Sequence, residues 1–534
     1  MPDADIHPPT RNLIEAWTRR VEREPERVAI TYFDATLSAR EVDRLTDALA
    51  VALARRGVTH GDRVGIYLQN IPQYPLTLLA LWKLGAAAVP VNPMYRGDEL
   101  ARLLTDSGAV GVVSSYDAAE DVRAVAASGV WVVTTDPHSF QTTDDPRVFT
   151  GIGRAEEDEL LSEAAQCDGQ APAAELSGDD LAILAYTSGT TGPPKGACNS
   201  HANVLAVASS YAAHVGLTSD DVVLGVAPLF HITGAVVNAT MALLHGGSLV
   251  LAGRFHPEVT LDEIRTHGVT FTIGSITVFN ALGAVPQAGR DDLASIRALY
   301  SGGAPIPPAT VERFEARFGH YIHNVYGMTE TTSAVVAVPL GERAPVDAAT
   351  DTLSVGKALP GLTARVVDAS GADVSTGAPG ELELSGPQVV SGYLDNPEAT
   401  ASTFPGGRLR TGDVAVIDAD GWVYLVDRIK DQINVSGFKV WPREVEDALY
   451  RHPSVHEAGV VGVPDDYQGE SVVAFVSLGT DAPRVGEDAL LEFVREHLAA
   501  YKRPKHIHVV DDLPKTQTGK IRRTALREVA HPTT

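Results

Sequence analysis

The chain has 534 residues, a length that predicts about two to four domains rather than one hydrophobic core. Its 44% hydrophobic and 21% charged residues are typical of a globular protein, and its formal net charge of −25 argues against nucleic acid or anionic lipid as a partner. The two cysteines, Cys167 and Cys198, are too widely spaced for a disulfide framework or a zinc site.

The N-terminus carries acidic residues and prolines where a signal peptide needs a basic and then an apolar region. The most apolar helical stretch, residues 76–89, is interrupted by Lys83 and is too short for a membrane span. We therefore expect a cytoplasmic protein, a monomer or homodimer, without a membrane span.

From about residue 63 to 326, short β-branched runs alternate with amphipathic segments, which predicts a mainly parallel sheet covered by helices. Residues 355–426 contain strand patterns broken by DASG, TGAPG and DADG turns, which favours antiparallel pairing. After Asp427, the helical patterns PREVEDALYRHP and EDALLEFVREHLA flank two strand-like runs. The sequence thus predicts an α/β fold, with a large N-terminal domain (1–429) that includes a small antiparallel β-rich subdomain. A small, mobile α+β C-terminal domain (430–534) follows.

The strongest local motif is YTSGTTGPPKG, residues 186–196, after the strand-like run LAILA. Its glycines let the backbone approach a ligand, while its hydroxyls and one lysine can surround a phosphate. By composition alone an ordinary surface turn is the commoner interpretation, and the spacing differs from the GxxxxGK[ST] loop. The candidate phosphate-binding residues are Thr187, Ser188, Gly189, Thr190, Thr191, Gly192 and Lys195.

This stretch resembles the signature loop of the acyl-adenylate-forming (AMP-binding) superfamily, in its acyl-CoA synthetase branch. The other motifs of that family follow in the expected order, and the resemblance covers about residues 12–523. It implies that YSGGAP and NVYGMTET hold the nucleotide, with Tyr326 stacked on adenine, Thr329 at the α-phosphate and Glu330 as the Mg²⁺ ligand. The remaining residues implied at the nucleotide are Gly302, Gly303, Ala304, Pro305, Asn324, Val325 and Gly327.

The resemblance extends to the C-terminal part of the chain. It implies that Asp413 in RTGD and Arg428 in VDRIKD bind the ribose, and that Lys430 is a hinge about which the C-terminal domain rotates between two half-reactions. Lys520 in PKTQTGKIRR then bridges the substrate carboxylate and the α-phosphate. The SGFKVWPREVE loop faces coenzyme A, with Ser436, Gly437, Phe438 and the catalytic candidate Lys439.

The segment APLFHITGAVVNA aligns with the acyl pocket of the family. His231 stands where amino-acid-activating members have an aspartate, which argues against an α-amino acid substrate. A lone histidine in an apolar run is more often structural than catalytic, so we expect a pocket role for it. The candidate pocket residues are His231, Ile232, Thr233, Gly234, Ser275 and Phe279.

The sequence thus predicts an ATP-dependent carboxylate–CoA ligase that uses ATP, Mg²⁺ and coenzyme A. A mostly apolar lining of small residues favours a medium- or long-chain fatty acid. An aryl or arylpropenoic acid is the close alternative, because Gly302 and Gly303 also admit a flat ring. A ligase that loads a carrier protein or an amine would keep every ATP motif. A nucleotide-binding regulator without catalysis is disfavoured by the intact Lys520 and Glu330 motifs.

Overall fold

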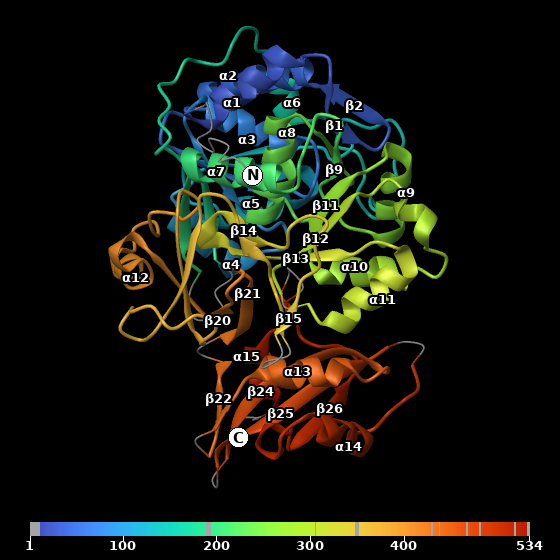
Figure 1. Cartoon of the computed structure of the whole chain (residues 1–534). Helices are drawn as coiled ribbons and strands as arrows, with labels where there is room; N and C mark the ends of the chain where they lie inside the picture. The colour runs from blue at the N-terminus through green and yellow to red at the C-terminus, as the bar shows by residue number, and fades with distance from the viewer. Residues whose placement is uncertain are drawn as a thin grey trace.

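The computed structural model describes residues 11–187, 194–304, 306–347, 352–428, 431–436, 438–465, 468–479, 482–516 and 520–530. They form a large N-terminal domain of layered sheets and helices and a smaller C-terminal domain, drawn in orange to red at the bottom of Figure 1. The mixed α/β architecture predicted from the sequence is confirmed. The predicted boundary at Lys430 lies outside the described residues.

The largest sheet has nine strands in the order β17-β14-β13-β12-β11-β9-β10-β1-β2. The pairs from β13 to β1 are parallel, whereas β2, β14 and β17 add antiparallel edges. The carboxyl ends of β9, β11, β12 and β13 therefore meet along one edge of the sheet. The strands are β1 (Val28–Tyr32), β2 (Ala35–Ser38), β9 (Val222–Leu224), β10 (Ser248–Leu251), β11 (Phe271–Gly274), β12 (Ala298–Ser301), β13 (Ile322–Met328), β14 (Ser333–Ala337) and β17 (Lys357–Ala358).

A six-stranded sheet has the order β6-β5-β3-β4-β7-β8, parallel except for β8, which runs antiparallel to β7. The pair β7 and β8 flanks the signature loop, so the sheet fixes both ends of that loop. The strands are β3 (Arg63–Tyr67), β4 (Ala87–Pro90), β5 (Gly111–Ser115), β6 (Trp131–Thr135), β7 (Leu181–Tyr186) and β8 (Gly196–Ser200).

Helices cover both sheets (Figure 1). The apolar stretch around residue 76 forms α3, all of whose residues are buried, as expected for a helix that is hydrophobic on every side. Its Lys83 forms ion pairs with Asp43 and Asp47, and one carboxylate oxygen of each lies 2.7 Å from Lys83 Nζ. Among the described residues, no helix is long and apolar enough to cross a membrane. The helices are α1 (Leu13–Arg23), α2 (Ala39–Arg55), α3 (Gln73–Lys83), α4 (Gly97–Ser107), η1 (Tyr116–Ala118), α5 (Ala119–Val125), α6 (Glu159–Ala165), α7 (His201–His214), the π-helical η2 (Gly234–Thr240), α8 (Met241–His245), α9 (Pro257–His267), α10 (Ile276–Ala284), η3 (Arg290–Leu293), α11 (Pro308–Phe318) and η4 (Thr329–Thr331).

The segment predicted to pair antiparallel does so, as a four-stranded sheet in the order β18-β19-β20-β21. A two-stranded ribbon, β15 with β16, precedes it. The elements are β15 (Val346–Asp347), β16 (Thr352–Leu353), β18 (Thr363–Val367), β19 (Gly380–Ser385), α12 (Pro397–Thr403), η5 (Pro405–Gly407), β20 (Leu409–Ile417) and β21 (Val423–Arg428).

The C-terminal domain is a sheet with helices, as predicted, and its core consists of its own residues, among them Val440, Val460 and Leu490. Within the SGFKV segment, which was expected as a loop, Phe438–Val440 form β23, which pairs antiparallel with β22 as a hairpin. The elements are β22 (Ile433–Val435), β23 (Phe438–Val440), α13 (Pro442–Tyr450), β24 (Val455–Asp465), β25 (Gly469–Leu478), α14 (Glu487–His497), η7 (Ala500–Lys502), β26 (His506–Val510) and α15 (Arg523–Ala530).

Candidate functional site

The predicted site residues gather where four parallel strands end. Ser275 follows β11, Gly302 follows β12, and Tyr326 lies near the end of β13. His231 lies in the connection after β9. Ligands of open α/β sheets bind at this edge, because the loops there leave a crevice outside the strand ends. Segments far apart in the sequence thus form one site.

Tyr326 and Asp413 form the first polar contact of the site. The Tyr326 hydroxyl donates to Asp413 Oδ2 at 2.7 Å, and Arg428 Nε lies 3.3 Å from Asp413 Oδ1. Asp413 and Arg428 are register partners on β20 and β21, so the antiparallel sheet itself pairs them. Burial raises the pKa of Asp413 above its usual value, although the Arg428 charge and the Tyr326 hydrogen bond act in the opposite direction. The two predicted ribose-binding residues therefore lie side by side.

Glu330 is held by a constrained turn. It lies in η4, and the two residues that follow this helix, Thr332 and Ser333, have φ angles of 55° and 111°. Side chains rarely adopt this backbone region, and it persists only where surrounding contacts determine it. Here Thr331 Oγ1 accepts from Met328 N at 2.9 Å, and Ser333 Oγ donates to Thr233 Oγ1 at 3.2 Å. The turn fixes the Glu330 carboxylate at the strand edge.

Tyr393 joins three parts of the site and was not among the predicted residues. Its hydroxyl donates to Glu330 Oε1 at 2.7 Å, and Lys195 Nζ lies 4.7 Å from the centre of its ring. The backbone of the same segment is also fixed, because Val390 N donates to Glu330 O and Leu394 N donates to Gly196 O. Tyr393 belongs to SGYLDNP, a string whose composition indicates only a turn.

Lys520 of the C-terminal domain reaches into this site. A Cβ atom built on Gly303 would lie 3.6 Å from Lys520 Cε, so the end of the Lys520 side chain lies close to Gly303 across the domain boundary. Gly303 has a φ of +82°, which favours glycine at this close approach. Burial and then the Arg428 charge lower the pKa of Lys520 to about 8, whereas Asp413 and Glu330 act to raise it. The predicted catalytic lysine lies among the predicted nucleotide-binding residues.

His231 faces the same ammonium group. Burial and then the charge of Lys520 lower the pKa of His231 to about 4, so the imidazole is neutral at physiological pH. Its Nδ1 accepts from Thr233 N at 3.3 Å, which assigns the remaining proton to Nε2. The next residues, Ile232 and Gly234, are packed closely, and a Cβ on Gly234 would lie 2.1 Å from Pro228 O.

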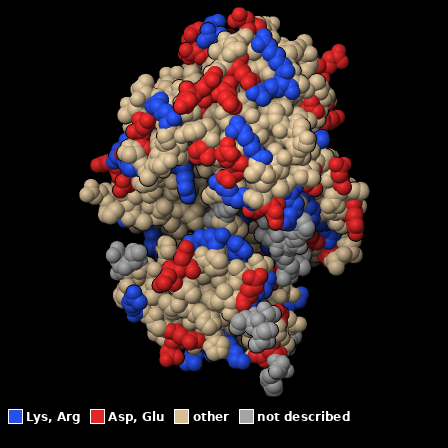
Figure 2. Space-filling view, turned by 180° about the vertical axis from the view of Figure 1, so that it is seen from behind, with Lys and Arg blue, Asp and Glu red and all other residues tan. Residues whose placement is uncertain are grey.

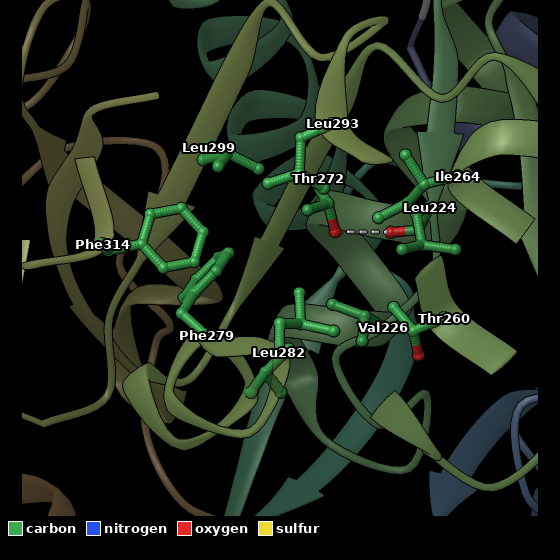
Figure 3. Close-up of a pocket in the computed structure, with 11 residues that line it drawn as sticks. Leu224, Val226, Thr260, Ile264, Thr272, Phe279, Leu282, Leu293, Leu299 and Phe314 are labelled. Carbon is green, nitrogen blue, oxygen red and sulfur yellow. Dashed lines mark hydrogen bonds between the residues drawn. The ribbon is translucent and has the colours of Figure 1, made fainter. Parts of the chain in front are cut away.

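Phe279, a predicted pocket residue, lies on α10 in an apolar cluster with residues of α9 and α11. Figure 3 shows its ring beside that of Phe314, with ring centroids 5.6 Å apart in an edge-on arrangement, and a hydrogen bond of 2.9 Å from Thr272 to Leu224 O. The void among these side chains has a volume of about 10 Å³, room for about one water molecule. This environment favours a packing role for Phe279.

Two further predicted residues make close contacts within the protein itself. The Asn324 side chain is 1% exposed, donates to Ser354 O at 3.2 Å and accepts from Val325 N at 3.0 Å. Gly327 leaves no space for a side chain, since a Cβ there would lie 1.8 Å from Ser333 O. Both residues hold the strand that carries Tyr326.

Other predicted residues lie at the surface or outside the description. Thr187 and Lys195 close the two ends of the signature loop, with Thr187 N donating to Lys195 O at 3.0 Å. Thr329 and Ala304 are partly exposed beside Glu330 and Gly303. Phe438 and Lys439 are exposed on the β22–β23 hairpin, where the Phe438 ring lies 4.9 Å from that of Tyr501 and Ser436 has a φ of 52°. The predicted residues that lie outside the described ranges are Ser188, Gly189, Thr190, Thr191, Gly192, Pro305, Lys430 and Gly437.

The acidic residues of the site fit a magnesium ion that is held mainly by phosphates. Within the described ranges, no group of three or more acidic, histidine or cysteine side chains could form a protein-only metal cage. Mg²⁺ bound with a nucleotide needs only one or two carboxylates, since phosphates and waters supply the other ligands. Glu330 is 7% exposed, and Tyr393 engages one of its two oxygens. Glu330 is thus suited to be that carboxylate.

The face shown in Figure 2 bears Lys and Arg side chains interspersed with Asp and Glu, and a furrow separates the two domains. Several basic side chains border this furrow. An anionic ligand at this face therefore meets individual cations rather than one broad basic surface.

Comparison with known families matches both domains. The AMP-binding enzyme family matches residues 17–394, and the AMP-binding enzyme C-terminal domain matches residues 444–520. Among curated relatives, a feruloyl-CoA synthase from Amycolatopsis sp is 35% identical over 95% of this chain and 97% of its own. A long-chain-fatty-acid–CoA ligase from Escherichia coli O157:H7 is 33% identical over 97% of this chain and 95% of its own.

A solved relative, MatB from Rhodopseudomonas palustris, is 31% identical, with 97% of this chain and 99% of that chain covered. Its ATP-bound structure matches with a TM-score of 0.87, and its apo structure with 0.78. The arrangement described above therefore agrees better with the ATP-bound form of that relative.

Proposed function

This chain belongs to the AMP-binding enzyme family and is an AMP-forming acid–CoA ligase that uses ATP, Mg²⁺ and coenzyme A. On that premise we propose a division of the chemistry among its residues. The observation that carries the proposal is the Lys520 side chain of the C-terminal domain, which lies against Gly303 and within the electrostatic reach of Asp413 and Glu330.

In the first half-reaction, a carboxylate oxygen of the acid attacks the α-phosphorus of ATP, and the bond to pyrophosphate breaks. The acid is already ionised at neutral pH, so the reaction needs no general base. The barrier comes from bringing two anions together and from the charge that develops at the phosphorus. The Lys520 ammonium lowers both parts of that barrier. Mg²⁺, bound by Glu330, would neutralise phosphate charge.

The ribose and the base are held by the sheet. Asp413 accepts hydrogen bonds from the ribose hydroxyls, and Arg428 orients the Asp413 carboxylate. The Tyr326 ring provides the face against which adenine stacks. The Thr329 hydroxyl donates a hydrogen bond to the α-phosphate. The ends of the signature loop, Thr187 and Lys195, would contact the β- and γ-phosphates.

In the second half-reaction, the coenzyme A thiolate attacks the acyl carbonyl and AMP leaves with the bonding electrons. The β22–β23 hairpin with Phe438 and Lys439 then serves the thiol side after a rotation of the C-terminal domain. In the present arrangement Lys520 contacts the site and this hairpin is exposed, which corresponds to the adenylation step.

We infer that the acid is a medium- or long-chain fatty acid. The His231 imidazole is neutral and lies near the Lys520 charge, so this side chain offers no counter-charge for an α-ammonium group. Ile232 is 2% exposed and packs in the apolar core next to His231. The relationship to a long-chain-fatty-acid–CoA ligase supports this substrate class.

An arylpropenoic acid is the second candidate, and a specific observation favours it. The feruloyl-CoA synthase is 35% identical over almost the entire chain. In addition, a Cβ built on Gly303 would meet only the end of the Lys520 side chain, at 3.6 Å, so the backbone there could lie against a flat ring.

The test is pyrophosphate release from MgATP with a panel of saturated fatty acids, benzoic acid and hydroxycinnamic acids, with and without coenzyme A. We expect release that depends on the acid and turns over repeatedly only when coenzyme A is present, with the highest kcat/KM for a fatty acid. A higher kcat/KM for a hydroxycinnamic acid would select the second candidate. A single burst of acyl-AMP, unchanged by coenzyme A, would contradict the thioester step.

A further inference from the structure

Asp427 is a buried carboxylate at the edge of the N-terminal domain, next to the end of β21. Its side chain is 3% exposed, yet its partners come mainly from the other domain. Oδ2 accepts from Arg443 N at 3.0 Å, and Oδ1 lies 3.1 Å from Arg523 Nη1. Asp427 thus binds the C-terminal domain at two separate points.

The first of these points is the beginning of α13. Arg443 lies in its first turn, and the side chain of the N-cap residue Trp441 makes no capping hydrogen bond. The first N–H groups of a helix have no partner within the helix and favour a negative charge. Asp427 supplies that charge from the other domain. Arg443 adds a second link across the boundary, since its Nη1 donates to Leu425 O at 2.7 Å.

The second point is Arg523, the first residue of α15. Besides Asp427, it pairs with Glu446 at 2.8 Å and with Asp431 at 3.3 Å. Glu446 lies on α13 and Asp431 follows the predicted hinge, so both belong to the same domain as Arg523. Of the three carboxylates that pair with Arg523 in the described part of the chain, only Asp427 belongs to the N-terminal domain.

Arg523 lies three positions after Lys520 in the sequence, so its anchoring restrains the segment that carries the lysine. We propose that Asp427 is a positioning residue that docks the C-terminal domain in the orientation with Lys520 in the adenylation site. The proposal rests on the adenylation role of Lys520. It makes the charge of Asp427 necessary for the first half-reaction and dispensable for the second, in which Lys520 has no part.

The test compares Asp427→Asn with Asp431→Asn. Both substitutions are isosteric and remove one negative charge next to Arg523, but only the first removes it from the N-terminal domain. The first readout is the rate at which an amine-reactive acetylating reagent labels Lys520, followed by mass spectrometry. Lys505, whose side chain is 58% exposed, serves as the internal reference. We expect Asp427→Asn to raise Lys520 labelling about tenfold, in line with the loss of a hydrogen bond to a charged group. Asp431→Asn should leave it near the wild-type rate.

The second readout separates the two half-reactions. Asp427→Asn should slow acyl-AMP formation about tenfold. Thioester formation from supplied acyl-AMP and coenzyme A should stay within about twofold of the wild-type rate. Asp427→Glu, which keeps the charge, should recover part of the first rate. Arg523→Lys keeps a cation but lacks the fork that contacts Asp427 and Glu446 together, so it should behave like Asp427→Asn and provides a second variant.

Unchanged labelling in Asp427→Asn, an equal fall of both half-reactions, or the same behaviour in Asp431→Asn would each overturn the docking role. If the wild-type protein forms no acyl-AMP from any acid, the proposed function fails, and the labelling comparison still decides whether Asp427 docks the domain.

Discussion

At the scale of single residues, the state of Lys520 determines how the first half-reaction depends on pH. Its pKa is lowered to about 8, so the ammonium form that attracts both anions is lost as the pH rises through that value. We expect kcat/KM for acyl-AMP formation to fall above about pH 8, because this parameter reports the free enzyme. Stopped-flow measurement of pyrophosphate release across the alkaline range tests this.

Lys520→Arg provides the matched comparison, because a guanidinium stays protonated at these pH values. Its acyl-AMP formation should be slower than wild type but should lose the alkaline decline. Lys520→Ala should lower the rate about 100-fold or more, as expected for the loss of a charge at the transition state. A wild-type profile that stays level beyond about pH 9 would contradict the assigned role.

Tyr393 is expected to tune the metal affinity of Glu330. Tyr393→Phe removes the hydrogen bond to Glu330 and keeps the ring against which Lys195 lies. Loss of such an outer contact should weaken metal–nucleotide binding about tenfold. Titration of Mn²⁺ with a non-hydrolysable ATP analogue, followed by electron paramagnetic resonance, measures this without turnover.

Tyr424→Phe is the control for this substitution. Its hydroxyl also donates to a carboxylate, Asp418 Oδ2 at 2.9 Å, but at a turn that is not part of the site. It should bind Mn²⁺ as the wild-type protein does. Equal Mn²⁺ affinity in Tyr393→Phe and the wild type would remove Tyr393 from the metal site.

At the scale of elements, β13 and the turn after it depend on Gly327. Gly327→Ala would drive a methyl group into Ser333 O, which has to move together with the Glu330 turn. We expect the free energy of unfolding to fall by about 1–3 kcal/mol, as for overpacking in a core, and acyl-AMP formation to slow as well. Gly283→Ala, in α10 with nothing within 4 Å of the new Cβ, should instead be neutral or stabilising by up to about 1 kcal/mol. Chemical denaturation of both variants checks this.

Much of this element layout could be predicted from the sequence. The alternation of β-branched and amphipathic segments predicted the parallel strands, and the Gly- and Asp-rich turns predicted the antiparallel sheet, because both patterns follow local geometry. The contact of Tyr393 with Glu330 joins residues 63 positions apart, and that of Arg523 with Asp427 joins residues 96 apart. No local pattern encodes such pairs. The positive φ of Ser333 is likewise imposed by its surroundings.

Phe279 was predicted to line the acyl pocket but packs in the apolar core. Its position after β11 agrees with a pocket residue, but strand and helix geometry direct it against Phe314. Which face of a short helix meets the ligand depends on the packing of the neighbouring helices. The sequence therefore predicted which strand ends the candidate residues follow, but it could not assign every side chain to the crevice.

At the scale of the whole molecule, Lys520 lies in the site while Phe438 is 57% exposed on its hairpin. If both serve the same site, the C-terminal domain has to adopt two orientations in one catalytic cycle. We expect small-angle X-ray scattering to give two distinct profiles. The profile with a non-hydrolysable MgATP analogue should agree with this structure, and the profile with an acyl-AMP analogue and coenzyme A should differ from it. One common profile would contradict a change of orientation.

The separate core of the C-terminal domain has a consequence for engineering. Its two apolar clusters draw only on residues from Ile433 onwards. Its described links to the rest of the chain are few, and they include the partners of Asp427, the contact of Lys520 with Gly303 and the Trp441 ring against the cluster around Trp422. A C-terminal domain from a relative could therefore be grafted after residue 428 if these contacts were kept. Such a hybrid should retain the acid preference of this chain, because the candidate acyl pocket lies entirely on the N-terminal side of the graft.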